Sequence, residues 1–181
     1  SRTFRSRGSA ASIENLPAAL RAAMRAGRKS KIENQKRCPV VTCTSASPAD
    51  TEIAGREFAR DMRAGAIIAL VGPLGAGKTQ FVKGLVREIG APVPVTSPTF
   101  TLIHEYTGGR LPIYHFDFFR IEDRQSAERL GLDEYFFGDG ISVVEWADKF
   151  PELIPPGARW ISLEPTSETD RLITIREDPG A

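Results

Sequence analysis

The sequence is poor in the residues that build disulfide frameworks, metal clusters and membrane spans. It has two cysteines and two histidines among 181 residues. Two cysteines are too few for a disulfide scaffold, and Cys38 and Cys43, with no histidine or further cysteine near them, make a poor zinc site. We therefore expect both thiols to be reduced and inert, as in a reducing compartment. The longest apolar run, residues 64–72, has the length of a buried strand and falls well short of the roughly 20 residues that a membrane-spanning helix needs.

Acidic residues are scarce at the beginning of the chain and abundant afterwards. Residues 1–47 contain ten Lys or Arg against two acids, a balance of +8, whereas residues 48–181 contain fourteen against twenty-one, a balance of −7. A basic segment is thus joined to an acidic body. Because proteins hold nucleic acid largely through positive charge, the body alone is not expected to hold RNA through its overall field.

Residues 1–47 differ from the rest in composition as well as in charge. They are rich in Ser, Arg, Ala and Lys with little aliphatic material, so we predict a disordered extension with one helix over residues 12–25. Three interpretations stay open. The first is a flexible extension, either native or produced by translation from a start upstream of the true one. The second is an organelle transit peptide, typically Arg- and Ser-rich and poor in acids, and the third is an arm that contacts RNA. The expected location is the cytoplasm, or an organelle if the extension is a transit peptide.

Residues 48–181 are expected to form one α/β domain. The pattern predicts a helix that Asp50 or Thr51 caps and Gly65 ends, followed by a continuous apolar strand over residues 66–71. A Gly-rich loop and an amphipathic helix closed by Gly90 come next. The later expected elements are two strands joined by a hairpin turn, one short helix and three further strands, over residues 100–106, 111–116, 124–130, 141–144, 160–163 and 172–175. This order predicts a three-layer α/β fold with a mixed, mainly parallel sheet.

The Gly-rich loop carries the strongest chemical signal. Its residues, Gly72-Pro73-Leu74-Gly75-Ala76-Gly77-Lys78-Thr79, fit the phosphate-binding pattern G-x-x-x-x-G-K-[ST]. Glycine permits the positive φ values and the close approach that let backbone N–H groups surround a phosphate, and the following helix adds its positive dipole end. Lys78 is placed to reach the β- and γ-phosphates, and the Thr79 hydroxyl to bind Mg²⁺. The alternative is a strand-to-helix turn that binds nothing. Since the motif follows a buried strand and opens an amphipathic helix, it favours a P-loop that binds a nucleoside triphosphate with Mg²⁺.

Two carboxylates follow apolar strands and are candidates for the metal side of the site. Asp117 ends the run 111–116, and Glu145 ends the run 141–144. Ligands of α/β folds bind at this end of the strands, although a solvated strand end is the equal alternative for each residue. A Pro-rich loop over residues 91–98 precedes these strands. The hydroxyls of Ser97, in this loop, and Thr99, directly after it, fit either a switch segment near the γ-phosphate or ordinary turn chemistry.

The two histidines and one tryptophan have structural alternatives. His104 and His115 lie near strand ends without a paired carboxylate or cysteine, so each is interpreted as structural rather than catalytic. Trp146 fits packing better than stacking on a base.

These motifs together resemble one family, the bacterial TsaE (YjeE) proteins, small P-loop ATPases needed to make N6-threonylcarbamoyladenosine in tRNA. The resemblance covers about residues 48–165. It rests on the P-loop and on four further blocks, Ser97-Pro98-Thr99-Phe100-Thr101-Leu102, Tyr114-His115-Phe116-Asp117-Phe118-Phe119-Arg120, Gly131-Leu132-Asp133-Glu134-Tyr135-Phe136 and Val144-Glu145-Trp146. Pro73 stands where the family usually has Asp or Asn, and Phe119 replaces the usual Tyr, so any role of that hydroxyl is in doubt here.

The resemblance implies roles for individual residues. Lys78 would bind phosphates, Thr79 and Glu145 would ligate Mg²⁺, and Asp117 would serve ATP hydrolysis by orienting water. The expected nucleotide-binding residues are Asp50, Thr51, Gly72, Leu74, Gly75, Ala76, Gly77, Lys78, Thr79, Gln80, Ser97, Thr99 and Trp146.

The resemblance also implies partners. In this family TsaE joins the TsaB–TsaD pair, TsaD carries the transfer chemistry, and ATP hydrolysis by TsaE resets the complex, so tRNA is met only indirectly. A site completed by another protein is expected to be slow alone. Two other functions stay open. One is a small P-loop metabolite kinase, whose lid would need Arg120, Arg124 or Arg129. The other is a nucleotide-sensing module without hydrolysis, against which Asp117 and Glu145 argue.

Overall fold

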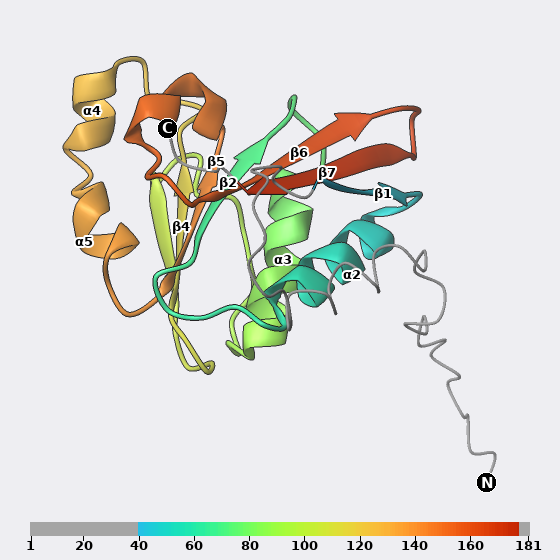
Figure 1. Ribbon diagram of the computed structural model, residues 1–181, viewed down its shortest axis with the longest axis horizontal. Helices are drawn as coiled ribbons and strands as arrows, with labels where there is room; N and C mark the ends of the chain where they lie inside the picture. The colour runs from blue at the N-terminus through green and yellow to red at the C-terminus, as the bar shows by residue number, and fades with distance from the viewer. Residues whose placement is uncertain (1–39, 178–181) are drawn as a thin grey trace, which may run out of the picture.

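A computed structural model describes residues 40–177, which form a seven-stranded mixed sheet between two helical layers (Figure 1). The strand order is β1-β7-β6-β2-β5-β4-β3. The elements in chain order are β1 (Val41–Ser45), α2 (Pro48–Ala59), β2 (Ile67–Val71), α3 (Lys78–Ile89), β3 (Ile103–Tyr106), β4 (Ile113–Asp117), α4 (Arg124–Glu128), α5 (Leu132–Phe136), β5 (Ile141–Glu145), the 3-10 helices η2 (Ala147–Lys149) and η3 (Pro151–Leu153), β6 (Arg159–Pro165) and β7 (Arg171–Glu177).

The sheet has a parallel centre and antiparallel edges. Strands β6, β2, β5 and β4 run parallel, whereas β3 pairs antiparallel with β4 and the β1-β7-β6 edge is antiparallel throughout. The predicted three-layer α/β fold with a mixed sheet is confirmed, with more antiparallel pairing at the edges than the sequence indicated. Within residues 40–177, every helix is too short or too polar to cross a bilayer.

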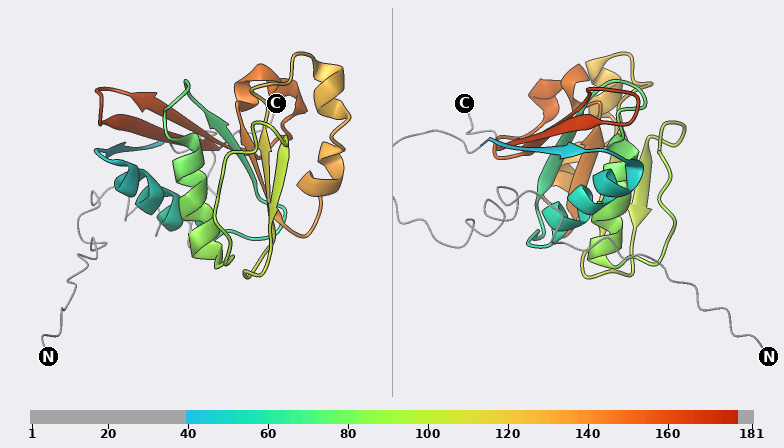
Figure 2. Two further views of the ribbon diagram at one scale, coloured as in Figure 1. Left: turned by 180° about the vertical axis from the view of Figure 1, so that it is seen from behind. Right: turned by 90° about the vertical axis from the view of Figure 1, so that its right-hand side faces the viewer.

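Two apolar clusters fill the space between the layers. One lies under α2 and α3, and the other under α4, α5 and the 3-10 helices, on the opposite face of the sheet (Figure 2). The central strand β2 contributes Ile68 and Leu70 to the first cluster and Ala69 to the second. This explains its unbroken apolar run, because alternate side chains of a doubly covered strand enter two cores.

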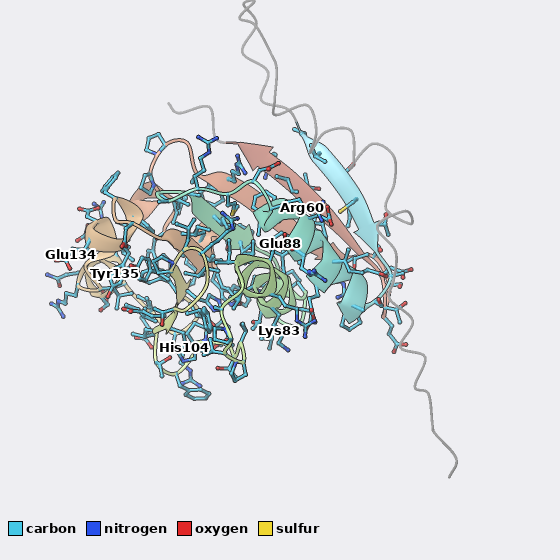
Figure 3. The ribbon with its side chains drawn as sticks, turned by 90° about the horizontal axis from the view of Figure 1, so that it is seen from below. Arg60, Lys83, Glu88, His104, Glu134 and Tyr135 are labelled. Atoms are coloured by element: carbon cyan, nitrogen blue, oxygen red, sulfur yellow. The ribbon has the colours of Figure 1, made fainter. Side chains whose placement is uncertain are left out.

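The helices α2 and α3 pack through glycine. A Cβ on Gly55 would lie 2.1 Å from the carbonyl oxygen of Phe81, and one on Gly84 would lie 2.0 Å from that of Glu52. Only residues without a side chain allow the two backbones this approach. Across the same pair, the Arg60 guanidinium lies 3.8 Å from a Glu88 carboxylate oxygen (Figure 3).

The start of α2 differs from the sequence prediction. Its N-cap is Ser47, whose hydroxyl accepts the Asp50 N–H at 3.1 Å, with Pro48 at the first helical position. Asp50 and Thr51 were the expected caps, but both lie inside the helix. The helix also ends at Ala59 rather than at Gly65. The Ser-Pro pair was the better signal, because proline is preorganised for the first helical turn.

The folded domain also begins earlier than the predicted boundary at residue 48. Strand β1 pairs with β7 in the register Val41↔Ile175, and Cys43 points into the core with 6% of its surface exposed. The segment Val41–Ser45 alternates inward and outward residues, but it is short and mostly polar on one side, so its composition resembled that of the preceding residues. The predicted helix over residues 12–25, Cys38 and the part of the basic extension before residue 40 lie outside the residues that the structure describes.

Candidate nucleotide-binding site

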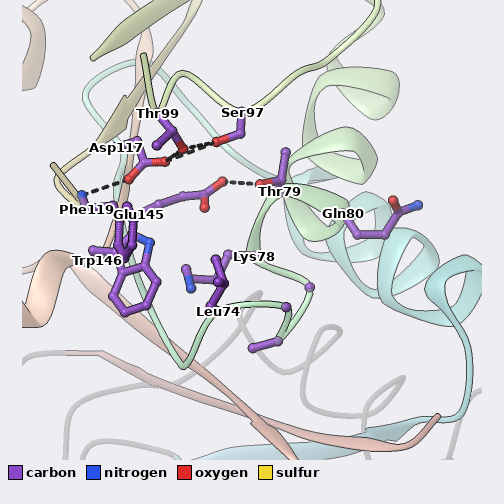
Figure 4. Close-up of a pocket in the computed structure, with 13 residues that line it drawn as sticks. Leu74, Lys78, Thr79, Gln80, Ser97, Thr99, Asp117, Phe119, Glu145 and Trp146 are labelled. Carbon is purple, nitrogen blue, oxygen red and sulfur yellow. Dashed lines mark hydrogen bonds between the residues drawn. The ribbon is translucent and has the colours of Figure 1, made fainter. Parts of the chain in front are cut away.

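A cavity of about 390 Å³ lies at the carboxyl ends of the parallel strands (Figure 4). The register places Asp117 of β4 beside Glu145 of β5, and Glu145 beside Leu70 of β2, two residues before the Gly-rich loop begins. The lining residues are Leu74, Gly75, Ala76, Gly77, Lys78, Thr79, Gln80, Ser97, Thr99, Asp117, Phe119, Glu145 and Trp146.

The loop has the backbone of an anion cradle. Gly75 and Gly77 have φ values of +79° and +101°, in the left-handed region that favours glycine. Gly77 is the N-cap of α3 and offers no side-chain cap to the helix. The first N–H groups of α3 therefore point into the cavity without a capping partner, which is the arrangement that binds phosphate at helix N-termini.

Lys78 folds back on its own loop. Its Nζ donates to the carbonyl oxygens of Gly72 at 2.7 Å and Pro73 at 3.0 Å, and it lies 3.7 Å from the ring centroid of Trp146. Burial lowers the pKa of Lys78, while the nearby carboxylates of Glu145 and Asp117 partly offset this shift. The ammonium group is thus held at the cavity by neutral carbonyls, and an anionic ligand would be a stronger partner for it.

Thr79 and Glu145 meet at the first turn of α3. The Thr79 hydroxyl donates to Glu145 Oε1 at 2.8 Å. Among the described residues no group of three or more His, Cys, Asp or Glu side chains gathers as a metal site. A Mg²⁺ ion bound together with substrate phosphates needs only one or two protein oxygens, and this hydroxyl–carboxylate pair is a donor set of that kind. The residues present therefore fit Mg²⁺ bound with a nucleotide.

Asp117 fastens the Pro-rich loop to the sheet. Its buried carboxylate accepts from Ser97 Oγ at 3.0 Å, from Thr99 Oγ1, and from the Phe119 backbone N–H at 2.9 Å. The three donors come from two segments, residues 97–99 and the turn that follows β4. In this structure Asp117 thus acts first as an anchor for residues 97–99.

Trp146 closes one wall of the cavity. It adopts a left-handed backbone with φ of +59°, which is unusual for a residue with a large side chain. Its ring lies between the Lys78 ammonium and the Phe119 ring, whose centroid is 5.0 Å away. The strained turn after β5 therefore aims the indole at the P-loop, rather than into a core cluster alone.

Most of the residues that the sequence nominated line the cavity, and three do not. Gly72, the first residue of the loop, does not line the cavity, and its carbonyl oxygen accepts a hydrogen bond from Lys78. Thr51 is fully buried, and its hydroxyl is bonded to Ser45 and Arg171, so it does not face the cavity. The Asp50 carboxylate accepts the backbone N–H of Ala46. Neither Asp50 nor Thr51 lines the cavity, and their expected part in nucleotide binding stays a prediction.

Two residues near the site were not nominated. Arg171 is buried, and its Nη1 lies 3.2 Å from where a Cβ on Gly77 would stand. His115 lies 2.9 Å from Glu145 Oε1. Arg171 is 94 positions beyond Gly77 in the sequence, so only the fold could reveal it. His115 carried a local signal, because it lies two residues before Asp117 and therefore on the same face of the strand.

A buried parallel strand, a glycine cradle at a helix N-terminus and carboxylates on the two neighbouring strands define a P-loop NTPase-type protein. The family described as "Threonylcarbamoyl adenosine biosynthesis protein TsaE" matches residues 45–173. The chain belongs to the TsaE family, as the sequence motifs had indicated.

Individual relatives agree with this assignment. The chain is 42% identical over 129 residues to the tRNA threonylcarbamoyladenosine biosynthesis protein TsaE of Bacillus subtilis, covering 71% of this chain and 80% of the relative. It is 38% identical over 133 residues to the protein of the same name from Treponema pallidum, covering 74% and 98%. The crystal structure of Bacillus subtilis YdiB matches with a TM-score of 0.67 and 33% identity, covering 80% of this chain and 89% of that one.

Proposed function

We propose that this chain binds ATP with Mg²⁺ and hydrolyses it, as the ATPase component of N6-threonylcarbamoyladenosine synthesis on tRNA. One observation carries the proposal: the Thr79 hydroxyl and the Glu145 carboxylate meet beside Lys78, at the mouth of the glycine cradle. The named function of the relatives from Bacillus subtilis and Treponema pallidum supports the place of this activity in tRNA modification. We place it in the cytoplasm, with the tRNA that these bacterial relatives serve.

The cradle and Lys78 would bind the phosphates. On binding, the Lys78 ammonium would exchange the carbonyl oxygens of Gly72 and Pro73 for phosphate oxygens, which are charged and form stronger hydrogen bonds. The backbone N–H groups at the start of α3 would surround the same phosphates. Trp146 and Phe119 form the apolar wall beside them.

Thr79 and Glu145 would hold Mg²⁺. The ion, when bound, supplies positive charge that neutralises the phosphate oxygens during transfer. The protein's own contribution is orientation: Thr79 presents its hydroxyl from the first turn of α3, and Glu145 presents its carboxylate from the end of β5.

Asp117 would orient the water that attacks the phosphate. It lies beside Glu145 in the sheet and reaches Ser97 and Thr99, whose hydroxyls line the same cavity. An acceptor at this position can hold an attacking water once the loop hydroxyls turn toward phosphate. We therefore assign Asp117 to hydrolysis and Ser97 and Thr99 to a switch-like loop.

The proposed partners are the TsaB–TsaD pair, with hydrolysis resetting the complex between turnovers. The site is open at its rim, where Leu74 is 79% exposed and Phe119 41%. Bulk water at an open rim weakens the electrostatic stabilisation of the reacting phosphates. We therefore expect low ATPase activity from the chain alone and higher activity when a partner completes the site.

A metabolite kinase is less well supported. Arg124 pairs with Glu128 on the surface, and the Arg120 guanidinium lies over the ring of Phe100. Neither these two residues nor Arg129 lines the cavity.

The deciding experiment is phosphate release from ATP by the purified chain, alone and with TsaB–TsaD, beside Lys78→Ala and Asp117→Ala. Slow release alone, a sharp rise with the pair, and flat traces for both variants would support the proposal. An unchanged rate with the pair, while ATP still binds, would retain the P-loop assignment and overturn the role in tRNA modification. Transfer of phosphate to small acceptors would then be measured next.

A further inference from the structure

A buried chain of hydrogen bonds runs from Glu145 to the Pro-rich loop. Glu145 Oε1 lies 2.9 Å from His115 Nε2, and His115 Nδ1 lies 3.3 Å from the Tyr106 hydroxyl. That hydroxyl lies 3.0 Å from the carbonyl oxygen of Thr96, which precedes Ser97 in the loop. His115 is fully buried, and Tyr106 is buried as well.

The contacts of the His115 ring make it a hydrogen-bond donor to Glu145. Burial raises the pKa of Tyr106 to about 12, so its phenol keeps a proton. Its hydroxyl donates to the Thr96 carbonyl oxygen, and Nδ1 of His115 and Nδ1 of His104 lie 3.3 Å and 3.4 Å from the same hydroxyl. His115 Nε2 lies 2.9 Å from Glu145 Oε1, and because a carboxylate oxygen only accepts, the ring nitrogen is the donor of this pair.

The Glu145 carboxylate is therefore held in one orientation. Its Oε1 receives both the Thr79 hydroxyl and His115 Nε2–H, and no hydrogen bond from residues 40–177 reaches Oε2. The His115 side chain has little freedom to reorient. Its ring centroid lies 6.0 Å from that of Tyr106, and its backbone is paired with Val143 of β5. Two fixed donors on one oxygen leave the other oxygen directed toward a ligand.

We propose that His115 is a positioning residue that orients Glu145 for a divalent cation and, through Tyr106, ties that orientation to Thr96 in the Pro-rich loop. The inference rests on the proposed binding of ATP with Mg²⁺ and adds to it a residue that touches neither ligand. Partners of metal ligands that fix their orientation typically change metal affinity 10–100-fold when removed. A histidine that only fills the core would have no such effect on the metal alone.

The experiment separates metal binding from nucleotide binding. Mn²⁺ binding in the presence of ADP is followed by electron paramagnetic resonance, and binding of a fluorescent ADP analogue is measured in EDTA. His115→Leu removes the donor, His115→Gln retains a side-chain N–H, and Tyr106→Phe removes only the hydroxyl. Tyr114→Phe is the matched control, because Tyr114 neighbours His115 on β4 but donates to Asp139 away from the site.

The expected result is a dissociation constant for Mn²⁺ raised about 10–100-fold in His115→Leu, largely recovered in His115→Gln, and raised less in Tyr106→Phe. Binding of the ADP analogue in EDTA should stay within about twofold of wild type in all variants, and Tyr114→Phe should match wild type throughout. Wild-type Mn²⁺ affinity in folded His115→Leu would overturn the inference. If that variant does not fold, unchanged affinity in Tyr106→Phe overturns the link to the loop.

Failure of the inference and failure of the proposed function are distinguishable. A wild-type chain that binds no ADP analogue, or that binds no Mn²⁺ in the presence of ADP, overturns the proposed function and the inference with it. A wild-type chain that binds both, with His115→Leu indistinguishable from it, overturns the inference alone. An equal loss of analogue binding in EDTA would also overturn it, because a general distortion of the site would then explain the result.

Discussion

The anchor that Asp117 provides for the Pro-rich loop can be measured as a coupling free energy. Asp117→Ala removes the carboxylate, and Thr99→Val removes one of its donors while keeping the shape of the side chain. The Thr99 hydroxyl donates to Asp117 and lies 2.6 Å from Ser97 Oγ, which has its own bond to the same carboxylate oxygen. A double-mutant cycle therefore isolates one contact within a three-residue cluster.

The structure sets the expected magnitude. A hydrogen bond to a charged group contributes about 1.5–3 kcal/mol to stability, so Thr99→Val should lower the free energy of unfolding by that amount. Asp117→Ala deprives three donors, including the Phe119 backbone N–H, of their acceptor, and should cost about 3–5 kcal/mol, since unsatisfied donors add their own penalty. The double variant should cost about 1–3 kcal/mol less than the sum of the two single variants.

The assay is urea denaturation of the four proteins without nucleotide. A coupling within about 0.3–0.5 kcal/mol of zero would refute the view that Asp117 holds the loop. Phosphate release from ATP then distinguishes anchoring from chemistry. If anchoring is the whole role of Asp117, combining Ser97→Ala with Thr99→Val should abolish release as fully as Asp117→Ala does. If Asp117 also orients water, the loop variant should retain activity that Asp117→Ala lacks.

Three further outcomes are expected. Burial raises the pKa of Cys43 from 9.0 to about 11, so between these pH values the folded state keeps a proton that the unfolded state loses. The contribution of this thiol to the free energy of unfolding is greatest below pH 9.0 and falls by up to about 2.7 kcal/mol as the pH rises to about 11. Urea denaturation at pH 8 and pH 10.5 should show part of this loss, and Cys43→Ala, with the other cysteine replaced, should lose less stability between these two pH values than the chain that keeps Cys43. Gly84→Ala should lower the free energy of unfolding by more than about 2 kcal/mol, because the new Cβ would collide with the carbonyl oxygen of Glu52. Replacing a helical glycine by alanine usually raises stability by up to about 1 kcal/mol, and such a gain in thermal denaturation would contradict the helix packing. Binding of ATP should change the fluorescence of Trp146, because Lys78 leaves its ring face; titration in a background lacking the other tryptophan should show no change in Lys78→Ala.

The local parts of the site were predictable from sequence. The cradle from Gly72 to Thr79 is contiguous, and each residue type has a stereochemical or electrostatic reason to be there. Asp117 and Glu145 could be nominated because each directly follows an apolar run, and parallel strands bring their carboxyl ends to one edge. Helix α3 and the central strands were found for the same reason, since their periodicity is read within a few residues, whereas the separate short helix α5 was not predicted.

The parts that depend on distant pairing were not predictable. Strand β1 is held by its register with β7, more than a hundred residues later, and its five residues have no strong pattern of their own. Thr51 was nominated near the nucleotide, but the fold turns its hydroxyl toward Arg171. The role argued for His115 needs two neighbours, Tyr106 from β3 and Glu145 from β5, that only the sheet brings to it.

Strand β4 connects the proposed metal ligand Glu145 to the Pro-rich loop through two of its side chains. His115 and Asp117 are two residues apart on this strand, so both side chains leave the same face. The first bonds to Glu145 and the second to Ser97 and Thr99, while Tyr106 connects His115 to Thr96 in the same loop. A displacement of the loop therefore disturbs two carboxylates together.

A stimulating partner that moves this loop should for that reason change more than the rate. With the proposed TsaB–TsaD pair added, the affinity of the ADP-bound chain for Mn²⁺ should shift in the same titration in which phosphate release rises, and Tyr106→Phe should weaken that shift, because it breaks the bond that carries the displacement to His115. A rise in rate at constant Mn²⁺ affinity would contradict this coupling. It would mean that the partner acts on the nucleotide directly, for example by covering the open rim at Leu74, and leaves the loop and Glu145 in place.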